Sequence, residues 1–270
     1  MTTCRTDQGL GRASVAAVSP KLGDTELVRI GLGTNRLSYT PAHVELVRAA
    51  VDAGVNFIDS AHLYAGGESE AVIGEALAPF PDDCIVATKG GYRPGEGRPR
   101  VLRAQIEESL RRLRTDTIAL YYLHRVDPQT PLEETLEVLA SCRERGQIRH
   151  VGVCSVDVEQ IERARRVVPI AAVQNHYNLA ERRHEDVIDH CAVEGILFVP
   201  YFPLRAPAPP AAAAIAERHG ATPAQIVLAW LLRRSPAMVP IPGTLSLEHV
   251  NENLGALDIE LTDEEFEALG

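Results

Sequence analysis

Eight short apolar segments recur along the chain, and stretches with helical periodicity separate them. The segments do not alternate apolar with polar residues, which is typical of strands covered on both faces. They cover residues 28–33, 55–58, 84–88, 117–123, 150–153, 170–173, 196–200 and 238–241. Eight strand–helix units predict an α/β fold, a (β/α)₈ TIM barrel that occupies residues 25–270 as a single domain.

The separating stretches support helices on the outside of such a barrel. One helix face collects four apolar residues between the third and fourth segments, at Leu102, Ile106, Leu110 and Leu113. Thr40 followed by Pro41 is a helix start signal, with Thr40 as the N-cap. A doubly wound open sheet is the alternative fold. It is disfavoured because the G-x-G at residues 31–33 lacks the third glycine and the helix of a dinucleotide fingerprint.

Length and composition limit the classes of protein. The 270 residues suit one large barrel, and residues 1–24 lack a strong period, so we expect this N-terminal segment to be partly disordered. The net charge of −10 argues against a nucleic-acid partner, which requires a basic face. There is no apolar run long enough for a membrane span or a secretory signal, which predicts a cytoplasmic protein. Five cysteines without a C-x-x-C disfavour a disulfide scaffold, and no metal site is expected.

Polar residues end several of the predicted strands. The second, third and fourth segments end at Asp59, Lys89 and His124. Barrel chemistry lies at the carboxyl ends of strands, so we expect these three side chains to meet. Each alone is explained by structure, as a buried Asp59–Lys89 ion pair and a core histidine. The three together at one barrel end favour a functional site.

Tyr64 adds a proton donor five residues after Asp59. A nearby ammonium favours the phenolate, so we expect Lys89 to lower the pKa of Tyr64 from its reference value near 10. Such a phenol can protonate a developing alkoxide near neutral pH. Asp59 would hold Lys89, and His124 would orient the carbonyl group.

These residues lie in motifs that resemble those of the aldo-keto reductases. The motifs are FIDSAHLY at 57–64, ATKG at 87–90, YLH at 122–124, VQNHYNL at 173–179, VPYFPL at 199–204, IPGT at 241–244 and EN at 252–253. They follow the order found in that family and cover roughly residues 25–268. The resemblance implies metal-free reduction of a carbonyl group by NAD(P)H on a (β/α)₈ barrel. It assigns the catalytic tetrad to Asp59, Tyr64, Lys89 and His124.

The resemblance also implies a set of cofactor-binding residues. Gln174 matches the residue that holds the nicotinamide carboxamide, and Tyr201 matches the aromatic residue that stacks on the nicotinamide ring. The remaining positions are Cys154, Ser155, Pro203, Leu204, Gly243, Thr244, His249, Glu252 and Asn253, of which Glu252 and Asn253 match adenine contacts.

Three departures from the family pattern affect the expected binding of the cofactor. Cys154-Ser155 replaces the usual Ser-Asn, which weakens one expected bond to the carboxamide. Gly243 and His249 stand where many members carry Lys and Arg for the 2′-phosphate of NADP, while Thr244 keeps the hydroxyl. We therefore expect NADPH as the cofactor, with NADH also accepted and a smaller preference for NADPH than in relatives with both cations. Arg205 replaces a residue that is commonly small.

Two other functions remain open at this point. The first is a Schiff-base aldolase on the same barrel, with Lys89 as the nucleophile. The second is a non-enzymatic, cofactor-binding regulatory protein. The VQNHYN and VPYFPL motifs are similar to a bacterial branch that contains pyridoxal reductases. The expected partner is a small carbonyl compound, and a monomer is the usual state in the family.

Overall fold

The computed structural model of the protein describes residues 19–270, so residues 1–18 of the predicted N-terminal segment lie outside the described residues. Seven parallel strands form one curled sheet in sequence order. They are β3 (Leu32–Gly33), β4 (Phe57–Asp59), β5 (Ile85–Gly90), β6 (Ile118–Leu123), β7 (Ile148–Cys154), β8 (Ile170–Gln174) and β9 (Leu197–Phe198). Each strand continues directly beside its predecessor, as helix crossovers on the outside require.

The eighth predicted segment closes the sheet into a barrel without forming a regular strand. Met238 makes a parallel bridge to Phe198, and Gly243 makes one to Gly33. The carbonyl groups of Pro240 and Pro242 accept hydrogen bonds from the backbone N–H groups of Gly31 and Gly33. Proline has no N–H to return, so this edge makes only half of a normal ladder. The fold is therefore the predicted (β/α)₈ barrel, with an eighth strand that proline keeps irregular.

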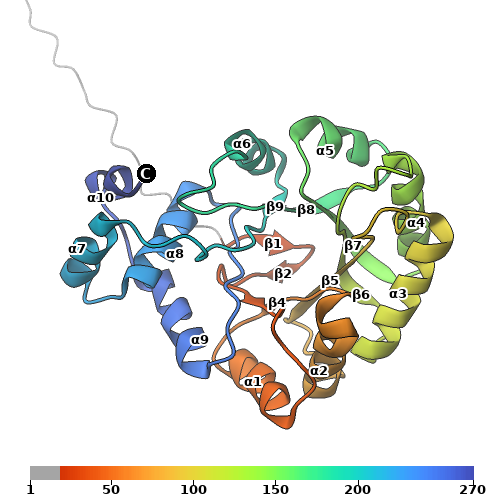
Figure 1. Cartoon of the computed structure of the whole chain (residues 1–270), viewed down its shortest axis with the longest axis horizontal. Helices are drawn as coiled ribbons and strands as arrows, with labels where there is room; N and C mark the ends of the chain where they lie inside the picture. The colour runs from red at the N-terminus through yellow and green to blue at the C-terminus, as the bar shows by residue number, and fades with distance from the viewer. Residues whose placement is uncertain (1–18) are drawn as a thin grey trace, which may run out of the picture.

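Helices form a ring around this sheet (Figure 1). They are α1 (Pro41–Asp52), α2 (Glu68–Leu77), α3 (Pro99–Leu113), α4 (Leu132–Glu144), α5 (Val158–Arg165), α6 (Glu185–Glu194), α7 (Pro210–His219), α8 (Pro223–Arg234), α9 (Leu247–Leu254) and α10 (Asp263–Leu269), with 3₁₀ turns η1 (Tyr64–Gly67) and η2 (Gly255–Asp258). Thr40 caps α1 by accepting a hydrogen bond from the backbone N–H of His43, as predicted. Leu102, Ile106 and Leu113 of α3 are buried against the sheet.

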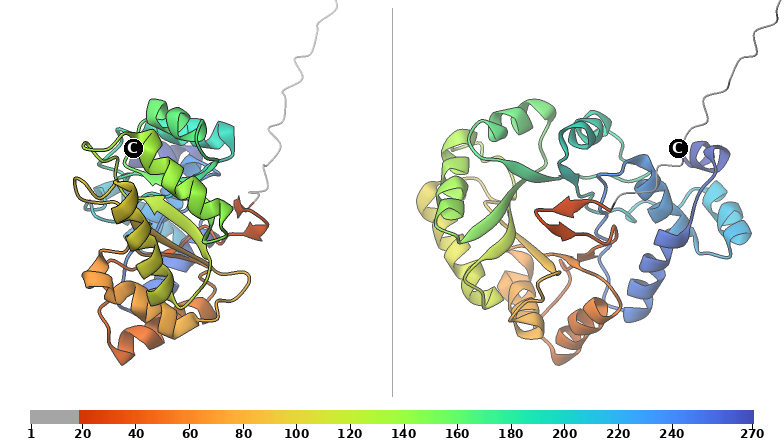
Figure 2. Two further views of the ribbon diagram at one scale, coloured as in Figure 1. Left: turned by 90° about the vertical axis from the view of Figure 1, so that its right-hand side faces the viewer. Right: turned by 180° about the vertical axis from the view of Figure 1, so that it is seen from behind.

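A short hairpin, β1 (Lys21–Leu22) and β2 (Thr25–Glu26), stands at one end of the barrel (Figure 2). Leu22 and Leu27 join the inner core that the strands enclose. Asn56, just before β4, accepts from Val28 N–H and donates to the Glu26 carbonyl, which ties the hairpin to the amino ends of the strands. The hairpin therefore closes the amino end, so the opposite, carboxyl end is where a ligand can enter.

Candidate active site

A buried ion pair lies at the carboxyl end of the barrel. The Lys89 ammonium on β5 donates to Asp59 Oδ1 on β4 at 2.6 Å and to the Ser60 carbonyl at 2.7 Å. Lys89 is fully buried and Asp59 is 2% exposed. Burial is the largest single effect on the pKa of Lys89 and lowers it, but the Asp59 carboxylate, together with Tyr64 and Cys154, more than offsets burial, so the pKa is raised. Lys89 is therefore a fixed cation beneath the site.

Tyr64 lies directly above this ammonium. Lys89 Nζ is 5.1 Å from the centroid of the Tyr64 ring. Burial raises the pKa of the Tyr64 phenol and outweighs the opposing effect of Lys89. Lys89 does act to lower this pKa, as expected, but desolvation of the phenolate is the larger effect, so the net shift is upward and not downward. The phenol stays protonated at neutral pH, as a proton donor must.

His124 follows β6 and faces Tyr64 edge-on, with the two ring centroids 6.1 Å apart. Burial lowers the pKa of His124 to about 2, and the nearby cations Lys89 and Arg125 add to this effect. The imidazole is therefore neutral throughout the physiological range. Its buried Nδ1 has no hydrogen-bond partner among the described residues. A neutral imidazole can donate one hydrogen bond without carrying a charge.

These side chains border a cavity of about 300 Å³. The predicted site residues that line it are Asp59, Tyr64, His124, Cys154, Ser155, Gln174, Tyr201, Pro203 and Gly243. Lys89 lies beneath the wall. The sequence analysis missed several wall residues, among them Tyr92, Arg125, His176 and Phe202. Three of them lie within two residues of a predicted site residue, at positions after His124, Gln174 and Tyr201, and this adjacency is the signal that could have found them.

The residues expected around the nicotinamide all line the cavity. The Gln174 amide donates to Asp59 Oδ2 at 2.8 Å, which keeps the carboxylate held on both oxygens. The Tyr201 ring stacks on His176, with centroids 5.2 Å apart and planes within 9°. Ser155 has a left-handed backbone (φ 56°), and its hydroxyl is 3.5 Å from the Tyr201 hydroxyl. Cys154 is buried, and burial raises the pKa of its thiol.

The remaining predicted cofactor positions lie beyond the cavity wall. Thr244 Oγ1 accepts from the Ser246 N–H and is 3.4 Å from Nδ1 of the exposed His249. Glu252 accepts a hydrogen bond from the hydroxyl of Thr222 at 2.6 Å, and Thr222 is the N-cap residue of α8. Asn253 is buried and Leu204 is half-buried.

Arg36, in the loop after β3, places a cation next to Gly243, one of the predicted cofactor-binding residues. Its guanidinium donates to the carbonyl of Gly243. The sequence analysis did not single out Arg36, because 207 residues separate it from Gly243 along the chain.

The model of the aldo/keto reductase family matches residues 29–270. The chain belongs to this family. It is therefore an oxidoreductase, and the resemblance that its motifs predicted is confirmed.

Three relatives illustrate the match. An uncharacterized oxidoreductase of Schizosaccharomyces pombe, C215.11c, is 36% identical over 92% of this chain and 88% of its own. The pyridoxine 4-dehydrogenase of Escherichia coli is 34% identical over 92% of this chain and 96% of its own. The aldo-keto reductase of Klebsiella pneumoniae, solved in complex with NADPH, superposes with a TM-score of 0.83 at 32% identity, covering 92% of each chain.

Two further findings concern residues 19–270. Within this range no helix is long and apolar enough to cross a membrane. The same range contains no group of three or more His, Cys, Asp or Glu side chains arranged to hold a metal ion.

Proposed function

We propose that this protein reduces an aldehyde or ketone to the alcohol with NADPH, and that Tyr64 is the general acid. The observation that carries the proposal is the Tyr64 phenol on the wall of the cavity, with its ring centroid 5.1 Å from a buried ammonium. When the phenol gives up its proton, the Lys89 cation stabilises the phenolate left behind. Asp59 holds that cation in place, and Gln174 in turn holds the Asp59 carboxylate.

His124 is suited to orient the substrate. Its imidazole is neutral and borders the same cavity as Tyr64, so it can donate a hydrogen bond to the carbonyl oxygen. Two donors aimed at one oxygen stabilise the negative charge that develops there during reduction. The Tyr64 proton then completes the alcohol.

The residues present fit a nicotinamide cofactor. When bound, NADPH supplies a hydride from C4 of its nicotinamide ring. Gln174 and Ser155 line the cavity with groups that can bind a carboxamide, and Tyr201 offers an aromatic wall. Gly243 also lines the cavity and packs closely on the loop after β3, because a Cβ there would lie 3.2 Å from the Gly33 carbonyl oxygen and 3.3 Å from Asn35 Oδ1.

The outer part of the cofactor would lie against residues that extend beyond the cavity. We propose Thr244 and His249 for the 2′-phosphate, together with the N–H groups at the start of α9. Glu252 and Asn253 would border the adenine, and Pro203, which lines the cavity, and Leu204 would also contact the cofactor.

The Schiff-base alternative is disfavoured by the state of Lys89. A nucleophilic lysine must be neutral and reach the substrate. The Lys89 ammonium is instead fully buried and bound to Asp59 and Ser60, with a raised pKa. A cofactor-binding regulatory protein without turnover is separated from an enzyme by assay.

The test is the loss of reduced-nicotinamide absorbance with a panel of aldehydes and ketones. Pyridoxal belongs in the panel, because a relative is a pyridoxine 4-dehydrogenase. Turnover of one carbonyl compound with NADPH supports the proposal. Tight NADPH binding without turnover of the panel would favour the regulatory alternative. Borohydride trapping of a substrate on Lys89 would favour the aldolase.

We further propose that the protein is a monomer and that it is located in the cytoplasm.

A further inference from the structure

A buried carboxylate on α2 connects two elements of the active site. Glu70 is fully buried, and its Oε1 accepts from the Thr88 hydroxyl at 2.6 Å. Its Oε2 accepts from Arg112 of α3 at 3.3 Å. Thr88 directly precedes Lys89 on β5. Since a buried carboxylate persists only when it is partnered, Glu70 and Arg112 hold each other in place against the strand that carries Lys89.

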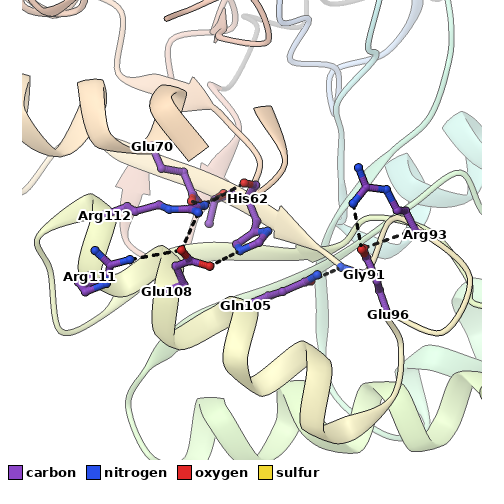
Figure 3. Close-up of polar contacts among 10 residues, drawn as sticks. His62, Glu70, Gly91, Arg93, Glu96, Gln105, Glu108, Arg111 and Arg112 are labelled. Carbon is purple, nitrogen blue, oxygen red and sulfur yellow. Dashed lines mark hydrogen bonds and ion pairs between the residues drawn. The ribbon is translucent and has the colours of Figure 1, made fainter. Parts of the chain in front are cut away.

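Arg112 is also bonded to the segment that leads to Tyr64. Its guanidinium donates to the His62 carbonyl at 3.0 Å and to Glu108 Oε1 at 2.7 Å. The other Glu108 oxygen lies 2.9 Å from Nε2 of the His62 ring. Figure 3 shows the guanidinium between Glu70, Glu108 and the backbone of His62. Both the backbone and the ring of His62 are therefore held from α3.

The backbone after Tyr64 needs such support. Ala65, Gly66 and Gly67 are consecutive left-handed residues, with φ of 47°, 66° and 102°. This conformation is unfavourable for a residue with a Cβ, such as Ala65. Gly67 packs directly on the guanidinium, since a Cβ there would lie 2.1 Å from Arg112 Cζ. One guanidinium thus contacts the chain on both sides of Tyr64.

We infer that Arg112 is a positioning residue, which, held by Glu70 and Glu108, fixes the Tyr64 phenol relative to Lys89 and the cavity. This inference rests on the proposed function of Tyr64. Proton transfer requires close geometry, and a displacement of about 1 Å can cost about 10²-fold in rate. Loss of the guanidinium should therefore lower kcat through Tyr64, although Arg112 itself does not touch substrate.

The test compares R112M and R112K with R111M as the control. Arg111 is the preceding residue on α3 and is mostly exposed, and within residues 19–270 its side chain bonds only to Glu108, at 3.3 Å. We expect R112M to lower kcat about 10- to 100-fold with little change in KM or in the Kd for NADPH. R112K keeps the charge without the planar fork, so its kcat should be intermediate. R111M should behave as wild type.

A second readout, independent of turnover, is hydrogen exchange of the amides of residues 60–67. Exchange there should be faster in R112M than in R111M. If R112M does not fold, R112K decides by the same two readouts. Wild-type kcat in the Arg112 variants, or an equal loss in R111M, would overturn the inference. Failure of the wild type to reduce any carbonyl compound would overturn the proposed function instead. The exchange data would still test whether Arg112 holds the backbone around Tyr64 in place.

A separate observation concerns the mouth of the cavity. Arg125 follows His124, lines the cavity and is exposed, with its Cζ 4.8 Å from the Tyr92 ring centroid. The Tyr92 ring is in turn 4.8 Å from the His124 ring. Among residues 19–270 no carboxylate forms an ion pair with Arg125, and Asp59, the one acidic residue of the wall, is bound to Lys89. In a chain of net charge −10, this leaves Arg125 as an uncompensated cation next to His124, the residue proposed to orient the carbonyl group.

We propose, again on the basis of the proposed function, that the site prefers carbonyl compounds that carry an anionic group, which Arg125 binds. The test uses 4-carboxybenzaldehyde and its methyl ester, which differ mainly in charge. Wild-type kcat/KM should favour the acid about fivefold, the upper range for an exposed ion pair. R125M should remove the preference, and R205M, which changes a second cation of the wall, should keep it. Equal kcat/KM for both aldehydes in wild type, or a preference that survives R125M, would overturn the proposal.

Discussion

Replacing Lys89 by Met tests how the site is built. Met has a similar length but no charge, so the substitution leaves the Asp59 carboxylate buried with only the Gln174 amide as a side-chain partner. Breaking a buried pair from one side costs about 3–5 kcal/mol. For a domain of this size each kcal/mol shifts Tm by about 2–4 °C, so Tm should fall by about 6–20 °C. Reduction should be lost as well, because Tyr64 loses its neighbouring cation.

Thermal melting by circular dichroism measures the stability loss, with Lys89→Met/Asp59→Asn as the matched control. The double variant removes both charges, so most of the stability should return while activity stays absent. In the single variant the unpaired Asp59 favours its protonated form, so its folded-state pKa should rise. The deficit should then be largest at neutral pH and should shrink as the pH falls through that pKa. An unchanged Tm in the single variant would refute the buried ion pair.

The remaining predictions concern pH and cofactor choice. The lowered pKa of His124 means that kcat/KM for reduction should show no histidine inflection between about pH 5 and 8, and an inflection there would show a charged His124. Only the protonated phenol of Tyr64 can donate a proton, and its pKa is raised, so reduction should be lost only above the ordinary tyrosine pKa near 10. A loss of activity near neutral pH would show that the effect of Lys89 on this pKa outweighs the effect of burial. His249→Arg should raise the ratio of NADPH to NADH affinity about tenfold, measured as Kd, and an unchanged ratio would remove His249 from the phosphate site.

The barrel could be predicted because its strands are covered on both faces and end in polar residues. That pattern identified the carboxyl end of the sheet, and the structure brings Asp59, Tyr64, Lys89 and His124 together there. The position of the eighth strand was predicted correctly, but its irregular hydrogen bonding was not predicted. The reason is that Pro240 withholds an N–H from the neighbouring strand, which an apolar pattern does not report.

Two features of the site depend on tertiary structure and could not be predicted from sequence. The sign of the Tyr64 pKa shift depends on how completely the fold buries the phenol, whereas the sequence indicates only which charge is near. From the sequence, Arg112 is expected on the polar, solvent-facing side of an amphipathic helix. In the structure its guanidinium donates a hydrogen bond to the carbonyl of His62, fifty residues earlier in the chain. Only the packing of α3 against α2 shows this contact.

The most direct test of the central claim is Tyr64→Phe. The substitution keeps the ring above Lys89 and removes only the hydroxyl that would donate the proton. General acid catalysis contributes about 10²–10⁴-fold, so kcat for the best carbonyl substrate should fall by that factor while the Kd for NADPH stays close to wild type. A Tyr64→Phe variant that retains most of its kcat would contradict the account.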